Sequence, residues 1–275
     1  MTDGTAITVD TLVDGVHWNH HCSAADVGYK AVAVSVSDLA AMGARPRWML
    51  LSLSVPQPVD PAWIADFSTG VAHARATFGV ALIGGDTTRS PVISVSVTMA
   101  GTLVGPALCR HQARPGDDLW VTGVPGLAGM GYLRSAPSDA ALQLFRRPVP
   151  PLEFALALAE AGLAHGAMDL SDGLALDLPR LCASSRVGAN VDPDLLPWHP
   201  AFDADGDVRQ LQLSAGDDYQ LLFGAAPEAR EACAALAHRF GAQLTRIGRF
   251  TEAPAVALSD GSWPAPAFDH FGGPS

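Results

Sequence analysis

Lysine is almost absent from this sequence, because Lys30 is the single lysine among 275 residues. A P-loop nucleotide site needs the pattern G-x-x-x-x-G-K-[ST], and a protein kinase needs a strand lysine together with H-R-D and D-F-G motifs. Neither set of motifs occurs, and Lys30 lies in a Gly-Tyr-Lys segment outside any such loop. Zinc hydrolase signatures and the G-x-S-x-G motif are also absent. The sequence therefore excludes the common lysine-based nucleotide sites and these hydrolase classes.

Basic charge, paired cysteines and long apolar runs are scarce as well. The formal net charge is −11 and the pI is near 5.1, which argues against nucleic acid or an anionic membrane as a direct partner. The four cysteines are far apart and form no C-x-x-C pair, so neither a zinc site nor a disulfide framework is indicated. No run approaches the length of a membrane span, and the first ten residues do not resemble a signal peptide. We expect a soluble, cytoplasmic protein without membrane or nucleic-acid partners.

The length and composition predict a folded chain of two domains. Hydrophobic residues make up 48% of the sequence and charged residues 16%, as in globular proteins. The polar segment CRHQARPGDD carries a Pro-Gly turn signal and lies between two halves that each mix strand and helix patterns. We therefore expect an α+β fold with domains at 1–111 and 112–275, divided near His111.

Hydrophobic periodicity predicts the elements of both halves. Residues 27–41 are ambiguous because AVAVSVS alternates like a strand, but Asp26 before them and Gly43 and Pro46 after them favour a helix. Residues 80–83 read as a short buried strand that Gly84 and Gly85 turn at the following aspartate. The expected strands are 5–12, 47–55, 80–83, 91–104, 118–122, 166–170 and 244–250, and the expected helices are 27–41, 61–78, 123–135, 152–162, 174–184 and 227–240.

Aspartates beside glycines are the most informative feature that the sequence does contain. Hard cations such as Mg²⁺ take oxygen ligands, usually one or two carboxylates together with substrate phosphates. Acidic loops in a chain with almost no lysine therefore indicate phosphates held through a metal ion. The aspartates concerned are Asp10, Asp38, Asp86, Asp169, Asp172, Asp217 and Asp218.

Taken singly, each of these motifs also has an ordinary structural explanation. IGGDTT is typical of a plain turn at Asp86, although its glycines would also let backbone approach a phosphate. In MDLSDG a helix N-cap explains Asp172 but not Asp169. Within a helix, Asp38 lies either on a solvated face or toward a ligand, and GDDYQLLF is typical of a turn that leads into a strand. His17, in a cluster of histidines, is by itself most simply a polar surface residue.

Six segments in this order resemble the thiamine-monophosphate kinases: VDTLVDGVHW, GYKAVAVSVSDLAAMGARP, IGGDTTR, ALCRHQARPGD, MDLSDGL and GDDYQLLF. That family belongs to a superfamily with aminoimidazole ribonucleotide synthetase, selenophosphate synthetase and the hydrogenase maturation dehydratase. The resemblance covers nearly the whole chain. It implies a two-domain α+β fold in which the N-terminal domains of a homodimer form a shared β-barrel and the C-terminal domain is an α/β sandwich. The active site would lie in the cleft.

The resemblance also implies an activity and a set of site residues. The reaction would be Mg²⁺-dependent transfer of the γ-phosphate of ATP to thiamine monophosphate. Of the implied metal ligands, Asp38, Asp86 and Asp172 would form the catalytic set. The implied metal ligands are Thr8, Asp10, Asp38, Asp86, Asp169 and Asp172, the implied ATP contacts are Gly85, Arg110 and Ser171, and the implied substrate contacts are His17, Asp217 and Phe268.

Two departures from the family pattern leave other readings open. Asp217 stands where the family has glutamate in a G-E-D-Y pattern. Family members also carry an N-terminal segment with a G-D-D motif that supplies a further metal aspartate, and we expect the natural start to lie upstream of Met1. The alternatives are a truncated, non-catalytic homologue that binds nucleotide or thiamine phosphates, and another ATP-using enzyme of the same superfamily.

Overall fold

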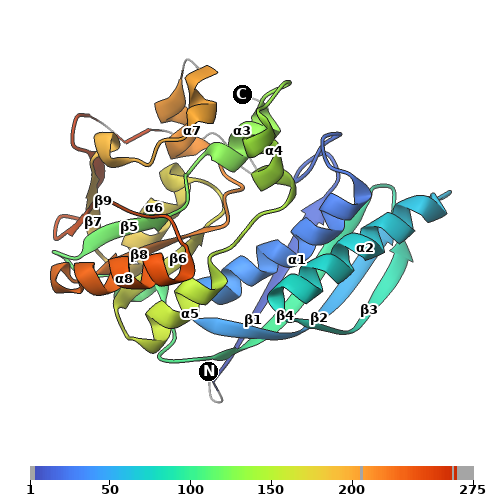
Figure 1. Ribbon diagram of the computed structural model, residues 1–275, viewed down its shortest axis with the longest axis horizontal. Helices are drawn as coiled ribbons and strands as arrows, with labels where there is room; N and C mark the ends of the chain where they lie inside the picture. The colour runs from blue at the N-terminus through green and yellow to red at the C-terminus, as the bar shows by residue number, and fades with distance from the viewer. Residues whose placement is uncertain (1–3, 205–206, 262, 265–275) are drawn as a thin grey trace.

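The computed structural model describes residues 4–204, 207–261 and 263–264. They form two mixed sheets with helices packed against them (Figure 1). The strands are β1 (Thr5–Val13), β2 (Ala44–Val55), β3 (Ala81–Arg89), β4 (Ser94–Leu103), β5 (Asp118–Thr122), β6 (Ala164–Leu170), β7 (Gly188–Val191), β8 (Gln220–Ala225), β9 (Leu244–Thr251) and β10 (Val256–Leu258). The α-helices are α1 (Ala24–Ala41), α2 (Pro61–Phe78), α3 (Leu127–Leu133), α4 (Asp139–Arg146), α5 (Leu152–Glu160), α6 (Leu174–Ser185), α7 (Val208–Ser214) and α8 (Arg230–Phe240), with 3₁₀ turns at Arg110–Gln112, Pro193–Leu195, Pro200–Ala204 and Pro227–Ala229.

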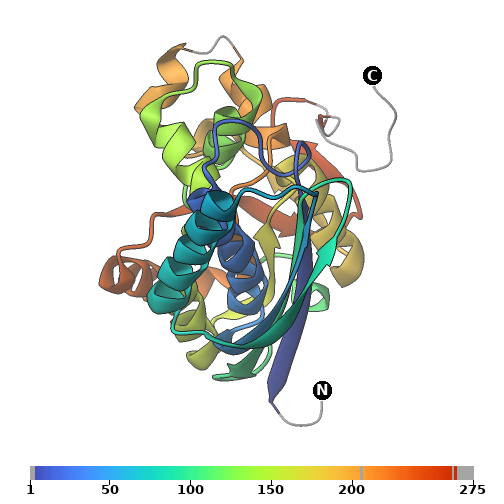
Figure 2. The ribbon, with the colours of Figure 1, turned by 90° about the vertical axis from the view of Figure 1, so that its right-hand side faces the viewer.

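The N-terminal half is an open four-stranded sheet covered by helices on one face. Its order is β1-β4-β2-β3, with antiparallel pairs except for the parallel β2–β3 pair at one edge. Figure 2 shows α1 and α2 on the same side of this sheet. Leu12, Val97 and Met49 point toward the helices and are buried, whereas Ile7 and Val9 of β1 point the other way and are exposed. The sheet therefore has one face covered by helices and one bare face, which carries exposed apolar side chains beside polar ones.

Helix α1 lies at the centre of the molecule. Its N-terminus is held by a capping box in which the Ser23 hydroxyl accepts from the Asp26 N–H and the Asp26 carboxylate accepts from the Ser23 N–H. The helix contacts α2, α5 and strands of both sheets, so nearly all of its residues are buried. A helix buried on all sides has no polar stripe, which explains why AVAVSVS lacks helical periodicity. The predicted helix is confirmed.

The C-terminal half is a six-stranded sheet with helices on both faces. The order is β10-β7-β9-β5-β8-β6, mostly antiparallel. In β5, Trp120 belongs to the core that includes α5 and α8, and Leu119 and Val121 belong to the core that includes α6. The α/β sandwich implied by the resemblance is present. A third, smaller cluster joins α3, α4 and α7 at one end of the molecule (Figure 1).

One element differs from its prediction. The chain does not turn at Gly84 and Gly85, because β3 continues in pairing with β2 to Arg89. A register shift at Met49/Leu50 accommodates the glycines, and every residue of β3 is exposed, so the prediction of a short buried strand was wrong. The sequence patterns also missed the short elements α4, β7, α7 and β10. No helix in the described part of the chain is both long and apolar enough to cross a membrane.

Candidate active site

A pocket between the two halves of the molecule collects predicted site residues from four segments. β1 contributes Thr8, α1 contributes Asp38, the linker contributes Arg110 and β6 contributes Asp169. The cavity holds about 390 Å³ and is also lined by Cys109 and apolar side chains. Residues far apart in the sequence therefore meet at a place where an arginine faces a cluster of oxygen ligands.

The carboxylates of this pocket are held by hydroxyl groups of neighbouring elements. The Thr8 hydroxyl donates to Asp38. On α1, the Ser35 hydroxyl donates to Asp10 at 2.7 Å. Two residues further along, on a different side of the helix, the Ser37 hydroxyl donates to Asp169 at 2.9 Å. Helical spacing thus places two serines of α1 opposite aspartates of two different strands.

Burial and the charges of neighbouring aspartates disfavour the charged forms of Asp10 and Asp169. Burial, followed by the Asp38 charge, raises the pKa of Asp10 to about 7. The pKa of Asp169 is raised well above its usual value, first by burial and then by the charges of Asp38 and Asp177. Within the described residues, none of Asp10, Asp38 and Asp169 forms an ion pair with an arginine, lysine or histidine. Buried carboxylates that lack a cationic partner are a common sign of a functional site.

The oxygen-only chemistry of this group fits Mg²⁺. Three carboxylates and a threonine hydroxyl are hard ligands, and magnesium usually takes only one or two protein carboxylates and completes its shell with phosphates and water. In the described part of the chain, no three His, Cys, Asp or Glu side chains stand at metal-binding spacing.

A second cavity, of about 130 Å³, lies beyond the end of β6. His17, Ser171, Asp172, Asp217 and Tyr219 line it together with apolar side chains, among them Val16, Tyr132 and Leu133. Only two residues separate Asp169 in the first cavity from Asp172 in the second. The linings of the two cavities share no residue, but they follow each other directly along the chain at the end of β6.

The ring of His17, which lines this second cavity, is held by a backbone hydrogen bond. Its Nδ1 accepts a hydrogen bond from the backbone N–H of Val13 at 3.0 Å. In the neutral ring, the proton must then be on Nε2, which becomes a donor. The backbone contact thus fixes the tautomer and orientation of the His17 ring.

Two backbone turns are joined at the floor of the second cavity. The N–H groups of Asp217 and Tyr219 donate to the carbonyls of Ser171 and Leu170, at 2.8 and 2.7 Å. Asp217 and Tyr219 have φ angles of 69° and 50°, in the left-handed region that non-glycine residues rarely adopt. Strain of this kind persists only where surrounding contacts hold it.

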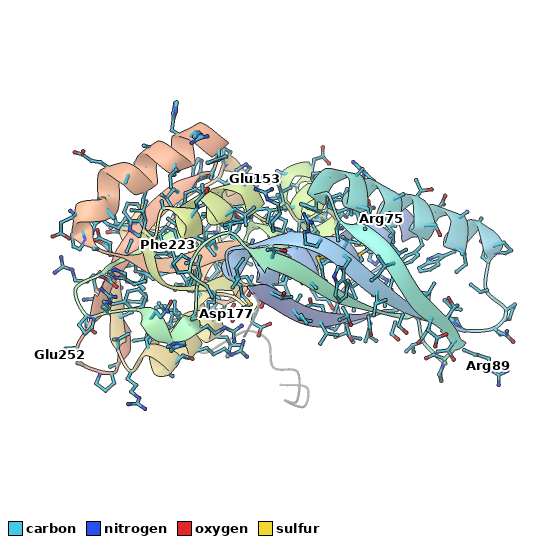
Figure 3. The ribbon with its side chains drawn as sticks, turned by 90° about the horizontal axis from the view of Figure 1, so that it is seen from below. Arg75, Arg89, Glu153, Asp177, Phe223 and Glu252 are labelled. Atoms are coloured by element: carbon cyan, nitrogen blue, oxygen red, sulfur yellow. The ribbon has the colours of Figure 1, made fainter. Side chains whose placement is uncertain are left out.

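The turn after β6 is fixed by an aspartate that the sequence analysis did not single out. One oxygen of Asp177 accepts from the N–H groups of Ser171 and Asp172, at 3.0 and 2.8 Å. Burial, followed by the Asp172 charge, raises the pKa of Asp177 to about 6. Arg180 contacts both Asp172 and Asp177. Figure 3 shows Asp177 near the middle of the molecule, where the two halves meet.

Asp218, the neighbour of Asp217, has a structural explanation. Its buried carboxylate accepts from the N–H groups of Gly126 at 2.6 Å and Ala128 at 3.3 Å, at the start of α3. Burial raises its pKa well above the usual value. The carboxylate therefore satisfies the helix terminus, and only the first aspartate of the pair lines the cavity.

Asp86 and Gly85 do not join the group. The register pairs Asp86 with Ser52, Ser52 with Ser96, and Ser96 with Thr11, which places all four on the bare face of the sheet. A Cβ atom at Gly85 would lie 1.9 Å from the Leu51 carbonyl oxygen, so strand pairing itself requires glycine there. Phe268, the implied aromatic contact, lies outside the described residues.

Family models match both halves of the chain. The model described as "AIR synthase related protein, N-terminal domain" matches residues 2–103, and the corresponding C-terminal-domain model matches residues 114–261. These matches, together with the two mixed sheets and the pocket between them, define the class: an AIR synthase related protein with a two-domain α+β fold.

Relatives narrow the class further. Thiamine-monophosphate kinase of Escherichia coli (strain K12) is 39% identical over 259 residues, which cover 90% of this chain and 78% of the relative. The crystal structure of thiamine-monophosphate kinase from Stenotrophomonas maltophilia K279a is 40% identical, with a TM-score of 0.86 over 94% of this chain and 86% of that one. AaThiL complexed with AMPPCP and TMP is 28% identical, with a TM-score of 0.87 over 97% and 87%. The chain belongs to the thiamine-monophosphate kinase family.

Proposed function

We propose that this chain is a kinase that transfers the γ-phosphate of ATP to thiamine monophosphate and yields thiamine diphosphate and ADP. The observation that carries the proposal is the pair of cavities that are lined by residues on either side of the end of β6. One contains Thr8, Asp38, Arg110 and Asp169, and the other contains His17, Asp172 and Asp217. Donor and acceptor phosphates bound in the two cavities would meet at the end of β6.

Positioning and charge are the main requirements of the reaction. The second pKa of a phosphate monoester is about 6, so the acceptor oxygen is already anionic near neutral pH and needs no general base. The barrier arises largely from bringing two anions together in line. In the proposed arrangement, Arg110 donates to a phosphate of ATP and Nε2–H of His17 donates to the phosphate of the substrate. Ser171, whose turn separates the cavities, contacts ATP.

The aspartates would hold Mg²⁺ at this junction. Bound there, the metal supplies positive charge that offsets repulsion between the phosphates. Asp38 and Asp169 line the nucleotide cavity, Asp10 lies behind them, and Asp172 lies on the substrate side. Asp172 is already paired with Arg180. Asp10, Asp38 and Asp169 pair with hydroxyl groups and with no cationic side chain among the described residues, so they form the better-prepared part of the site.

We further propose that the bare face of the N-terminal sheet is the homodimer contact and closes the β-barrel with a second copy. Ile7 and Val9 are 61% and 66% exposed, and Leu50 lies on the same face. A sheet face with such side chains needs a cover. Asp86 points out of this face, so in the dimer it would face the partner and act as a metal ligand in the partner's site.

Two further expectations remain part of the proposal. The domain division at 1–111 and 112–275 is supported by the short 3₁₀ turn at Arg110–Gln112, which connects the sheets. A reducing, cytoplasmic location is supported by the four free thiols of Cys22, Cys109, Cys182 and Cys233.

A coupled assay of ADP release tests the function. With ATP and Mg²⁺, turnover is expected to depend on thiamine monophosphate. Turnover with a purine precursor instead would indicate another enzyme of the superfamily. Tight binding of ATP and thiamine monophosphate without ADP release would indicate a non-catalytic homologue.

A further inference from the structure

The single lysine of the chain lies beside the substrate cavity, and the proposed chemistry has not used it. Lys30 is on α1 with 0% of its surface exposed. Its ammonium group lies 3.0 Å from Oδ1 of Asp217 and donates to the carbonyl oxygen of His17 at 3.1 Å. The same group stands 4.0 Å from the centre of the Phe145 ring. A buried ammonium is costly to desolvate, so this arrangement is stable only with all these partners present.

The two polar partners of Lys30 are on different walls of the cavity. Asp217 belongs to the turn before β8, and His17 belongs to the loop after β1. Both residues line the cavity, but Lys30 itself does not. One ammonium group thus connects the wall that carries the proposed phosphate donor with the wall that carries the proposed carboxylate contact.

The contacts also orient the Asp217 carboxylate. The Tyr219 hydroxyl donates to Oδ1 of Asp217 at 2.9 Å, and Lys30 contacts the same oxygen. In the described structure both contacts therefore end on Oδ1 and leave Oδ2 for a ligand. The left-handed backbone at Asp217 and Tyr219 needs such anchoring, since neither residue favours that conformation.

We propose that Lys30 is a positioning residue for thiamine monophosphate, which fixes Asp217 and the His17 loop at the spacing the substrate requires. This inference rests on the proposed substrate. Lys30 does not touch the nucleotide cavity, so its role is confined to the acceptor side.

The test replaces Lys30 with methionine, which keeps the length of the side chain and removes its charge. Hydrogen bonds to charged groups are worth about one to two powers of ten in affinity. The Kd for thiamine monophosphate, measured by calorimetry, is expected to rise about tenfold to a hundredfold. The Kd for AMPPCP with Mg²⁺, measured without thiamine monophosphate, is expected to stay within about twofold, because Lys30 does not line the nucleotide cavity and the variant keeps the backbone hydrogen bonds between the two turns.

Arg230→Met is the matched control. Arg230 pairs with the buried carboxylate of Asp118 at 2.6 Å, in the C-terminal sheet and away from the cavity. This variant is expected to lose stability and to keep both affinities. If Lys30→Met behaves like the control, or weakens both ligands equally, Lys30 is only a structural residue and the proposal is overturned.

A second variant covers the case in which Lys30→Met does not fold. Tyr219→Phe removes the other donor to Oδ1 of Asp217 without changing any charge. It is expected to weaken thiamine monophosphate several-fold, about threefold to tenfold, with little effect on AMPPCP. An unchanged affinity for thiamine monophosphate would show that fixing Asp217 is not required.

Binding and turnover separate the two proposals. If the wild-type chain binds thiamine monophosphate but releases no ADP, the kinase function fails and the Lys30 comparison can still be made. If the wild-type chain turns over and Lys30→Met keeps the wild-type Kd, the function stands and the positioning role fails. If the wild-type chain does not bind thiamine monophosphate at all, both proposals fail.

Discussion

At the scale of single residues, the arrangement of Asp10, Asp38 and Asp169 is unfavourable for stability and useful for metal binding. Hydroxyl donors hold the three carboxylates close together, where burial and repulsion raise the pKa values of Asp10 and Asp169. A structural core would not collect acids without cations. The cost in folding free energy is compensated only when a cation binds.

Asp169→Asn tests this trade-off. The amide still accepts a hydrogen bond from Ser37 and carries no charge. We expect kcat to fall at least about a hundredfold, or about 2.7 kcal/mol on the barrier. The free energy of unfolding in the absence of metal should stay within about 1 kcal/mol of wild type or increase. Thermal melts measure the stability, and steady-state rates at saturating Mg²⁺ measure kcat. Asp66→Asn, at an exposed position, is the control. An unchanged kcat in Asp169→Asn would reject the metal role.

Asp26 predicts one part of the pH dependence of stability. Burial alone would raise its pKa, but hydrogen bonds from Arg147 and Ser23 outweigh burial and hold the pKa below 3.8. A carboxyl with a lowered pKa in the folded state stabilises the protein above the unfolded pKa and loses this contribution as pH falls. We therefore expect the free energy of unfolding to decrease from pH 5 to about pH 3.

Urea unfolding at several pH values measures this change. Arg147→Met should reduce the dependence on pH in that range, because it removes the 2.7 Å ion pair with Asp26. An equally steep dependence in the variant would mean that other carboxyl groups cause the acid sensitivity.

Sequence motifs suggested most of the candidate site residues but not their supporting contacts. A resemblance can assign roles to aspartates because they lie in recognisable segments. Lys30 and Tyr219 lie in two of these segments and Asp177 lies just after a third, but they received no role, since each acts through a partner that only the fold brings near. For Lys30 the composition offered a signal, because a lysine within an apolar helix is rarely buried unless it has a polar partner.

At the scale of elements, the close crossing of α1 and α2 depends on glycine. A Cβ atom at Gly70 would lie 1.9 Å from the Ala25 carbonyl oxygen, and one at Gly28 would lie 2.2 Å from the Phe67 carbonyl oxygen. Neither contact can relax by rotating a side chain, because both involve backbone. The two glycines therefore set the distance between the helices, and with it the position of the serines on α1.

Gly70→Ala should separate the helices and destabilise the protein by about 1 to 3 kcal/mol or more, although alanine has the higher helix propensity. Thr69→Ala, at the exposed neighbouring position, should change the free energy of unfolding by less than about 0.5 kcal/mol. Denaturant unfolding compares the two. A more stable Gly70→Ala variant would show that the helices can separate without cost.

The elements were largely predictable, and the exceptions have physical causes. The helix at 61–78 begins after the Asp60 cap with proline in its first turn, so its limits were predicted correctly. The strand β3 was misjudged because Gly-Gly-Asp usually signals a turn, whereas pairing with β2 keeps the chain extended. Short elements such as α7 escaped prediction because its seven residues give too little periodicity to recognise.

At the scale of the whole molecule, the position of Asp86 makes a prediction about assembly. If Asp86 completes the site of a partner, a heterodimer of Asp86→Asn and Asp169→Asn contains one site with both changes and one with none. Mixing and refolding the two inactive variants should then recover about a quarter of the wild-type activity. Each variant refolded alone is the control.

No recovery of activity in the mixture would mean that Asp86 and Asp169 of one and the same chain serve a single site. Sedimentation of the mixture must show dimers for the comparison to hold. The sequence alone could not give this prediction, since the orientation of Asp86 follows from the register of β3 against β2.

The junction of the two turns has a consequence for the order of events during turnover. Backbone hydrogen bonds tie Asp217 and Tyr219 to Ser171 and Leu170, so neither turn can move without the other. A ligand that restricts the motion of one turn therefore lowers the conformational entropy that is lost when a ligand binds in the neighbouring cavity. This coupling of the two binding free energies must be reciprocal. Bound nucleotide should therefore increase the affinity of the protein for the acceptor, and bound acceptor should increase its affinity for the nucleotide. This cooperativity would arise from the few peptide groups that join the two turns.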